Sequence, residues 1–146
     1  MILVSSCLAG FCCRYDGNSN LVPEIRQLVD AGLAVTACPE QLGGLPTPRI
    51  PSERLGDSVI NRSGLDVTAE FMAGAEAALQ IARENGCHEA ILKSRSPSCG
   101  KGLIYNGQFT GELTAGNGIT ADLLLRSGIS VMTEEEYLRL LPDNQV

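Results

Sequence analysis

The hydrophobic positions of this chain fall into short apolar runs, separated by longer stretches in which apolar and polar residues recur with a helical period. Short apolar runs have the length of buried strands, whereas a 3.6-residue spacing is typical of amphipathic helices. The runs lie at 2–6, 33–37, 89–93 and 129–132, and the helical stretches at 23–31, 68–85 and 119–127. This alternation predicts an α/β fold with three layers, α/β/α, in which a mostly parallel, Rossmann-like sheet lies between helices.

The helix boundaries carry recognisable signals. Pro23 is suited to the first turn of a helix, and Gly32 is suited to ending it. Thr68 is expected to cap the long second helix. Thr133 and Glu136 match a capping box, which predicts a further helix at the C-terminal end.

Two segments interrupt the alternation of strands and helices. Residues 39–66 contain four prolines and no sustained periodicity, so we expect a long loop there, and loops of this length are usually functional or disordered. Residues 102–117 are expected to form a hairpin or an irregular excursion. Both segments therefore lie outside the expected core.

Composition and charge narrow the possible partners. The 146 residues carry a net charge of −6, and no two basic residues are adjacent. Nucleic-acid binding needs clustered cations that displace counterions from phosphates, so we expect no DNA partner and disfavour RNA. The N-terminus lacks the features of a signal peptide, and no apolar stretch approaches the roughly 20 residues that span a bilayer. We expect one domain, residues 1–146, in the cytoplasm and without a membrane partner, and its oligomeric state stays open.

Six cysteines in a chain with a cytoplasmic address favour metal binding or catalysis over disulfides. Cys7 follows the first predicted strand, Cys38 follows the second, and Cys99 lies in the loop after the third. Ligands of open parallel sheets bind outside the carboxyl ends of the strands, so these three thiols are expected to converge at one edge. Cys87 precedes the third strand, at the opposite edge, and is expected to be a small buried residue.

Converging thiolates bind zinc or iron–sulfur clusters. Structural zinc sites usually use four ligands that include closely spaced pairs, which the three isolated strand-end cysteines do not provide. A [4Fe–4S] cluster on three thiolates would keep one iron open for a substrate. The adjacent Cys12 and Cys13 leave a fourth ligand possible.

The segment from Val4 to Arg14 also resembles the phosphate-binding loop of small tyrosine phosphatases. That loop requires five residues between its cysteine and its arginine, whereas six residues separate Cys7 from Arg14. His88, the only histidine, precedes the third strand on the far side from the three cysteines, which disfavours Cys–His catalysis. A cysteine-nucleophile phosphatase is therefore the weaker alternative.

Four segments around the cysteines carry a family resemblance. They are Ser6-Cys7-Leu8-x-Gly10, Cys13-Arg14-Tyr15-Asp16-Gly17, Cys38-Pro39-Glu40-x-x-Gly43-Gly44-Leu45-Pro46-x-Pro48-Arg49 and Lys93-x-Arg95-Ser96-Pro97-Ser98-Cys99-Gly100. Together with Gly64-x-Asp66-Val67-Thr68, they resemble the DUF523 family, which includes the thiouracil desulfidases. The combination is specific, although no single motif is.

The resemblance implies a [4Fe–4S] cluster on Cys7, Cys38 and Cys99, whose free iron takes the sulfur of a thiocarbonyl. The substrate would be a small thiolated pyrimidine, a free base or nucleoside such as 2-thiouracil, and the products its oxo form and hydrogen sulfide. The competing hypothesis is a non-catalytic iron–sulfur or sulfur-carrier protein. In that case a fully ligated cluster would make Cys13 as essential as the other three cysteines.

The implied desulfidase chemistry also needs a base that activates water, because metal coordination assists only the leaving sulfur. Glu40, two residues after a proposed ligand, is predicted to be that base. Ser96 and Ser98 are predicted to bind the substrate or to donate to the leaving sulfur. Asp16 is a second acid–base candidate, although aspartate before glycine is first a turn signal. Arg14, Arg49 and Arg95 could orient substrate carbonyls, but such arginines more often brace loops.

Overall fold

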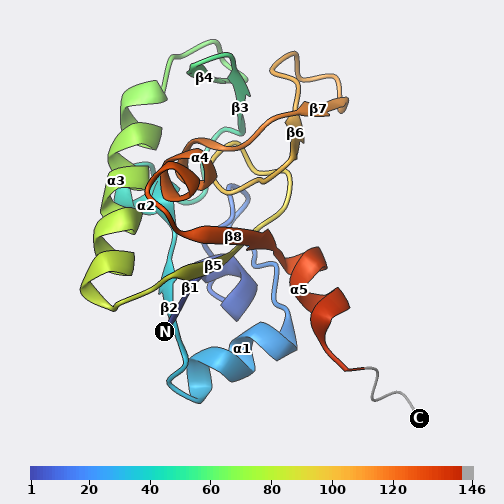
Figure 1. Cartoon of the computed structure of the whole chain (residues 1–146). Coiled ribbons are helices and arrows are strands. Elements are labelled where there is room, and N and C mark those ends of the chain that lie inside the picture. The colour runs from blue at the N-terminus through green and yellow to red at the C-terminus, as the bar shows by residue number, and fades with distance from the viewer. Residues whose placement is uncertain (143–146) are drawn as a thin grey trace.

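The computed structural model describes residues 1–142 and is built around a sheet of four parallel strands (Figure 1). The strands are β1 (Ile2–Ser5), β2 (Ala34–Ala37), β5 (Glu89–Leu92) and β8 (Ser130–Thr133), in the spatial order β2-β1-β5-β8. Each coincides with one of the apolar runs to within a residue at either end. The chain leaves β1 toward β2 and later returns to the other side of β1, so the direction of winding reverses between β1 and β5.

Helices cover both faces of this sheet, as Figure 1 shows. One face carries α1 (Pro23–Asp30) and α5 (Glu134–Leu140), and the other carries α3 (Thr68–Glu84) and α4 (Ile119–Arg126). The predicted three-layer α/β/α fold is therefore confirmed. In the part of the chain that the structure describes, no helix has the length and apolar character needed to cross a membrane.

Neighbouring residues along each strand pack into hydrophobic cores on opposite faces of the sheet. Val4 of β1 and Ile91 of β5 cluster with Ile25 of α1, whereas Leu3 and Leu92 belong to the cluster on the α3 side. All five side chains are nearly inaccessible to solvent. This alternation explains why the strands read as continuous apolar runs, because a strand covered on both faces has no solvent-facing position.

The segment 39–66 is more regular than the sequence predicted. It contains a short helix, α2 (Pro39–Leu42), and an antiparallel hairpin of β3 (Ser52–Leu55) and β4 (Ser58–Asn61). The expectation of a long loop was wrong because Gly56 and Asp57 form a tight two-residue connection, and Gly56 has the positive φ that such turns need. The expected second hairpin is present as β6 (Leu103–Tyr105) and β7 (Leu113–Ala115).

Two predicted boundaries differ in detail. The first strand ends at Ser5, and the next four residues, Ser6–Ala9, form a 3₁₀ turn. Thr68 is not the N-cap of α3: its amide donates to Asp66 Oδ1 at 2.9 Å, while its hydroxyl accepts the Val59 amide at 2.8 Å. Val67 is the N-cap residue instead, Asp66 accepts the first amide of the helix, and Thr68 fastens the start of α3 to β4. The capping box at the start of α5 is formed as predicted.

Candidate functional site

A cleft of about 660 Å³ opens at the carboxyl end of the sheet. Its floor is made by the segments that follow β1, β2 and β5, and its outer wall comes from the two hairpins. The topological argument predicts this position, because the connections after the neighbouring strands β1 and β5 lead to helices on opposite faces of the sheet. In Figure 1 the hairpins lie together at the top of the view, beyond the edge of the sheet.

Four thiols line this cleft. Cys7 lies in the 3₁₀ turn after β1, Cys38 is the N-cap residue of α2 after β2, and Cys99 follows β5. The fourth is Cys13, which is buried, while the adjacent Cys12 is exposed and does not line the cleft. The sequence therefore grouped the three strand-end cysteines, but it could not separate Cys13 from Cys12.

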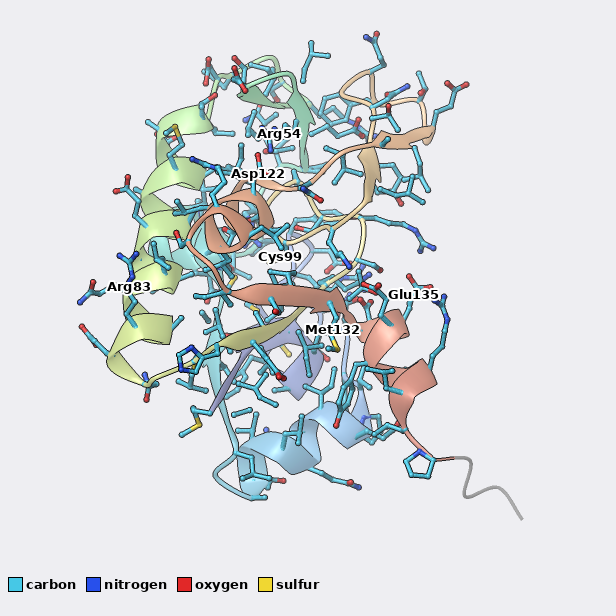
Figure 2. All side chains as sticks on the ribbon, viewed as in Figure 1. Arg54, Arg83, Cys99, Asp122, Met132 and Glu135 are labelled. Carbon is cyan, nitrogen blue, oxygen red and sulfur yellow. The ribbon has the colours of Figure 1, made fainter. Side chains whose placement is uncertain are left out.

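The remaining cysteine, Cys87, is only 5% exposed and packs in the core at the amino-terminal edge of β5. Figure 2 shows Cys99 in the interior of the molecule, where it is also 5% exposed. Burial does not distinguish these two cysteines. The end of the strand at which each one lies decides which of them reaches the cleft.

The cleft thiols differ in their affinity for a proton. The Cys13 thiol donates hydrogen bonds toward Cys38 and Cys7, and this keeps the pKa of Cys13 well above its usual range. The same bond is the main reason why the pKa of Cys38 falls to about 7 and why the pKa of Cys7 is lowered. The Asn20 side chain assists at Cys7, with its Nδ2 3.4 Å from the sulfur. Burial raises the pKa of Cys99.

A buried carboxylate fixes the start of the loop that carries Cys99. Glu134 accepts the Ser94 amide at 2.7 Å and the Ser94 hydroxyl at 3.1 Å. The Lys93 ammonium lies 3.2 Å from the same carboxylate and lines the cleft near Cys7, where its charge favours the thiolate. The end of β5 is thus held by charge-assisted hydrogen bonds, which are stronger than neutral ones.

The predicted base, Glu40, also lines the cleft and is paired with Arg49. Arg49 Nη2 lies 2.7 Å from Glu40 Oε2 and donates to the Cys13 carbonyl at 2.8 Å. The arginine side chain is only 5% exposed. Its Nε is buried without a hydrogen-bond partner, alone in this respect among the side-chain nitrogens and oxygens of residues 1–142. Arg49 therefore joins the carboxylate to the cysteine loop and keeps one donor free.

The two predicted serines have different positions. Ser96 lines the cleft, and its oxygen accepts the amides of Ser98 at 3.1 Å and Cys99 at 2.9 Å. Its own proton is therefore available to a group in the cleft. Ser98 is 1% exposed, and its hydroxyl lies 2.7 Å from that of Thr120 in α4. Ser98 does not reach the cleft, because it attaches the loop to the start of α4.

Asp16 does not line the cleft either. Its carboxylate is exposed, accepts the Asn18 amide at 3.0 Å and pairs with Arg14 at 2.9 Å. The Asn18 amide is the main reason why the pKa of this carboxyl is lowered. Asp16 therefore has the environment of a turn residue. Arg14 is held by Asp16 and by Asn20 Oδ1 at 3.0 Å, which does not favour the phosphatase interpretation.

The amino-acid sequence of this chain matches a known family. The model of the 2-thiouracil desulfurase family matches residues 2–136. The chain belongs to that family. It is also similar to YbbK of Bacillus subtilis (strain 168), an uncharacterized protein, with 47% identity over 151 residues that cover 97% of this chain and 100% of YbbK. The resemblance seen in the motifs is therefore confirmed.

A solved structure from the desulfurase family has the same fold. The [4Fe-4S]-dependent thiouracil desulfidase TudS (DUF523Vcz) matches this chain with a TM-score of 0.90 and 50% sequence identity. The match covers 95% of this chain and 93% of TudS. Fold and family thus agree along nearly the whole length.

The donors of this desulfurase-family cleft fit an iron–sulfur cluster. Thiolates are the ligands of such clusters, and the lowered pKa values of Cys7 and Cys38 favour that form. The free Nε–H of Arg49 supplies a donor of the kind that hydrogen-bonds to cluster sulfur. Within residues 1–142, no group of three His, Cys, Asp or Glu side chains is placed so that it could hold a single metal ion. A four-iron cluster does not need that arrangement, since each thiolate binds a different iron.

No role for the outer wall of the cleft was predicted from the sequence. That wall includes Glu53 of β3, Arg62 after β4 and Phe109 in the turn between β6 and β7. The one available signal was the Gly56–Asp57 pair, which is typical of a two-residue hairpin turn. No local pattern indicates that this hairpin meets a second one 50 residues later.

Proposed function

We propose that this protein is a [4Fe–4S]-dependent desulfidase that replaces the sulfur of a thiolated pyrimidine, such as 2-thiouracil, with oxygen and releases hydrogen sulfide. One observation carries the proposal: three strand ends bring cysteine thiols, a carboxylate and a serine hydroxyl into one cleft of a 2-thiouracil desulfurase family member. The free thiols of all six cysteines suit a reducing compartment, and we retain the cytoplasm as the expected location.

Cys7, Cys38 and Cys99 are the proposed ligands of the cluster. Each follows a different strand of the sheet, so the sheet itself fixes their separation. A bound cluster with three protein ligands supplies an open, Lewis-acidic iron for the thiocarbonyl sulfur. Arg49 and Lys93 balance the negative charge of the thiolates, because both cations line the cleft.

Glu40 and Ser96 carry the proton transfers in this proposal. Water adds its oxygen to the thiocarbonyl carbon while the Glu40 carboxylate takes one of its protons. The carbon–sulfur bond then breaks, and the sulfur leaves as hydrogen sulfide. One of its protons returns from Glu40, and the other comes from the hydroxyl added to the carbon and is relayed through the Ser96 hydroxyl. The sum is thiocarbonyl plus water giving carbonyl plus hydrogen sulfide. No electrons are gained or lost, so no reductant is needed.

The first test is the iron and sulfide content of protein purified without oxygen, together with turnover of 2-thiouracil. We expect about four irons per chain in the wild type, since a cube contains four. Serine substitution of Cys7, Cys38 or Cys99 should remove both iron and activity, whereas Cys12→Ser should retain both. Iron-free wild-type protein that resists anaerobic reconstitution would overturn the cluster-dependent mechanism.

A second measurement separates binding of the cluster from catalysis. Glu40→Gln keeps the size of the side chain and can still accept a bond from Arg49, but it cannot take a proton from water. We expect this variant to hold a full cluster and to lose about 100-fold or more in kcat, as is typical for loss of a general base. Full activity in Glu40→Gln would exclude Glu40 as the base.

The position of Cys13 favours one alternative. Its thiol lies within hydrogen-bonding reach of Cys7 and Cys38, so a fourth thiolate could close the cluster. A fully ligated cluster has no open iron and would suit an iron–sulfur or sulfur-carrier protein without catalysis. Loss of iron in Cys13→Ser, combined with no turnover by wild-type protein, would support that function over the desulfidase.

A further inference from the structure

One side chain of the first hairpin hydrogen-bonds to the second hairpin. Glu53 of β3 is nearly buried, and its Oε1 accepts the amides of Gly107 at 3.0 Å and Phe109 at 3.1 Å. The contact is close, because a Cβ on Gly107 would lie 2.9 Å from the Leu55 Cβ. A carboxylate that accepts two backbone amides is a charge-assisted anchor. The turn between β6 and β7 is therefore set by β3.

The next residue of β3 fastens the hairpin to the core. Arg54 points to the opposite face of the strand from Glu53, as successive strand residues do. It donates to the Asn117 carbonyl at 2.7 Å and lies 3.3 Å from Asp122 of α4. Figure 2 shows Arg54 and Asp122 turned toward each other. The wall of the cleft thus has a rigid connection to the sheet through α4.

Phe109 is held by this anchor in an unusual backbone conformation. Its φ is +56°, in the left-handed region that a bulky residue rarely adopts. Arg95, which has a φ of +66°, is the other non-glycine residue of this kind in the part of the chain that the structure describes. Both residues line the cleft. Strained backbone that the surrounding structure maintains is concentrated at binding sites, and this clustering motivates a functional explanation.

The ring of Phe109 is oriented as well as its backbone. The Arg62 guanidinium carbon lies 5.4 Å from the centroid of the ring, in a cation–π contact. The ring is half-buried and lines the cleft, so part of its surface is open toward a ligand. A planar aromatic ring in a cleft wall is suited to stacking against another planar ring.

We propose that Phe109 determines specificity by stacking on the pyrimidine ring of the substrate, and that Glu53 is the residue that positions it. The inference rests on the proposed function, and it adds a requirement that the thiocarbonyl belong to a flat, aromatic ring. Thioamides with the same polar groups but a puckered ring are therefore poor substrates. The cluster side of the cleft recognises sulfur, and the hairpin wall recognises the ring.

The test compares two substrates that differ in planarity. 2-Thiouracil and 5,6-dihydro-2-thiouracil carry the same thiocarbonyl, carbonyl and N–H groups, but only the first has an aromatic ring. Wild-type holoenzyme should show the higher kcat/KM with 2-thiouracil. Phe109→Leu should raise KM for 2-thiouracil about tenfold with little change in kcat, the scale seen when a stacked aromatic side chain is removed. It should leave the dihydro compound nearly unaffected, so the preference disappears.

Three variants distinguish stacking from general loosening of the hairpin. Phe109→Tyr retains a ring and should retain the preference. Glu53→Ala should lose the preference as Phe109→Leu does, while Glu53→Gln, which keeps a carbonyl acceptor, should restore most of it. Leu113→Ala is the matched control: it removes an apolar side chain from the same hairpin at an exposed position outside the cleft, and should leave KM unchanged.

The outcomes separate this inference from the proposed function. An active wild type whose preference for 2-thiouracil survives in Phe109→Leu would overturn the stacking role and leave the desulfidase intact. An equal loss in Leu113→Ala would also overturn it, because the effect would then belong to the hairpin as a whole. A wild type that holds its cluster but turns over neither compound would overturn the proposed function, and the inference with it.

Discussion

The Cys13 thiol holds its proton more strongly than the thiols of Cys7 and Cys38 hold theirs. Two thiolates side by side repel each other, so a neutral thiol between them lowers the free energy of both by donating hydrogen bonds. The lowered pKa values of Cys7 and Cys38 and the raised pKa of Cys13 express this one arrangement. The cluster-free cleft therefore favours the thiolate forms of Cys7 and Cys38, and the pKa of Cys38 lies at about 7.

Removing Cys13 should reverse the effect on Cys38. In Cys13→Ala the hydrogen bond is absent and burial still disfavours the thiolate, so the pKa of Cys38 should rise from about 7 toward its ordinary value of 9.0. The shift should be about one unit or more. The measurement is the pH dependence of alkylation of Cys38 in cluster-free protein, followed by mass spectrometry of its peptide.

Cys12→Ala is the control, since Cys12 is exposed and outside the cleft. It should leave the alkylation profile of Cys38 unchanged. If Cys38 titrates at the same pH in Cys13→Ala as in the wild type, the hydrogen bond is not the cause of its lowered pKa.

The same residues show where inference from sequence stops at this scale. Cys12 and Cys13, or Ser96 and Ser98, are neighbours or near neighbours of the same type, and only the path of the loop decides which one faces the cleft. Ser98 turns inward because its hydroxyl meets Thr120 of α4, 22 residues away. The sequence indicated a loop that lines the cleft, since its cysteine follows a strand. Side-chain direction inside an irregular loop depends on such distant partners.

At the scale of elements, α2 lies against α3 with almost no side chain between them. A Cβ on Gly74 would lie 1.8 Å from the Pro39 carbonyl oxygen, and one on Gly43 would lie 1.9 Å from the Glu70 oxygen. Two glycines therefore permit direct backbone contact. This contact sets the position of α2, which has Cys38 as its N-cap and carries Glu40 in its first turn.

Gly74→Ala should consequently destabilise both the fold and the site. Alanine in a helix normally stabilises by about 1 kcal/mol relative to glycine, but here the added methyl group overlaps backbone atoms. We expect a net loss of about 2 kcal/mol in the free energy of unfolding, measured by urea denaturation of the cluster-free protein. The displacement of Pro39 should also lower the iron content.

Ala73→Ser is the matched control, because it adds one atom at the adjacent, exposed position of α3. It should change stability by less than about 0.5 kcal/mol and leave the iron content intact. An equal free energy of unfolding for Gly74→Ala and the wild type would show that α2 and α3 can move apart without loss of stability.

The sequence predicted elements well where the periodicity was continuous and poorly where it was not. The four parallel strands and the long helices follow from apolar spacing alone, and Thr133 with Glu136 marks the last helix correctly. The hairpin at 52–61 was missed because prolines on its N-terminal side gave the whole segment the character of a loop. Its partner at 103–115 was expected, but the Glu53 bond that joins the two hairpins has no local signature.

At the scale of the whole molecule, the strand topology determines where the cysteines of the candidate site meet. Three cysteines far apart in sequence meet because three parallel strands end at the same edge. The fold class predicted from the alternating elements and the family predicted from the motifs are confirmed. The protein has a net charge of −6, yet the cleft is lined by Arg14, Arg49, Arg62, Lys93 and Arg95. Such a local excess of cations suits a site that holds several thiolates and their cluster.

A cluster on Cys7, Cys38 and Cys99 would also connect β2, β1 and β5, three neighbouring strands, at their carboxyl ends. A ligand that binds only the folded chain adds its binding free energy to stability, so the holo protein should unfold at a higher temperature than the cluster-free protein. For a domain of this size we expect a difference in Tm of about 5 °C or more, measured by circular dichroism under anaerobic conditions. Cys99→Ser should unfold near the cluster-free wild type.

Cys87→Ser provides the comparison that isolates this effect. Cys87 is buried in the same protein but at the amino-terminal edge of the sheet, outside the cleft. Its substitution should lower the Tm of the holo and cluster-free forms alike, because it places a hydroxyl in an apolar core and leaves the proposed ligands in place. The difference between the two forms should then survive in Cys87→Ser and vanish in Cys99→Ser. Equal Tm values for holo and cluster-free wild type would mean that the cluster does not bridge the strand ends.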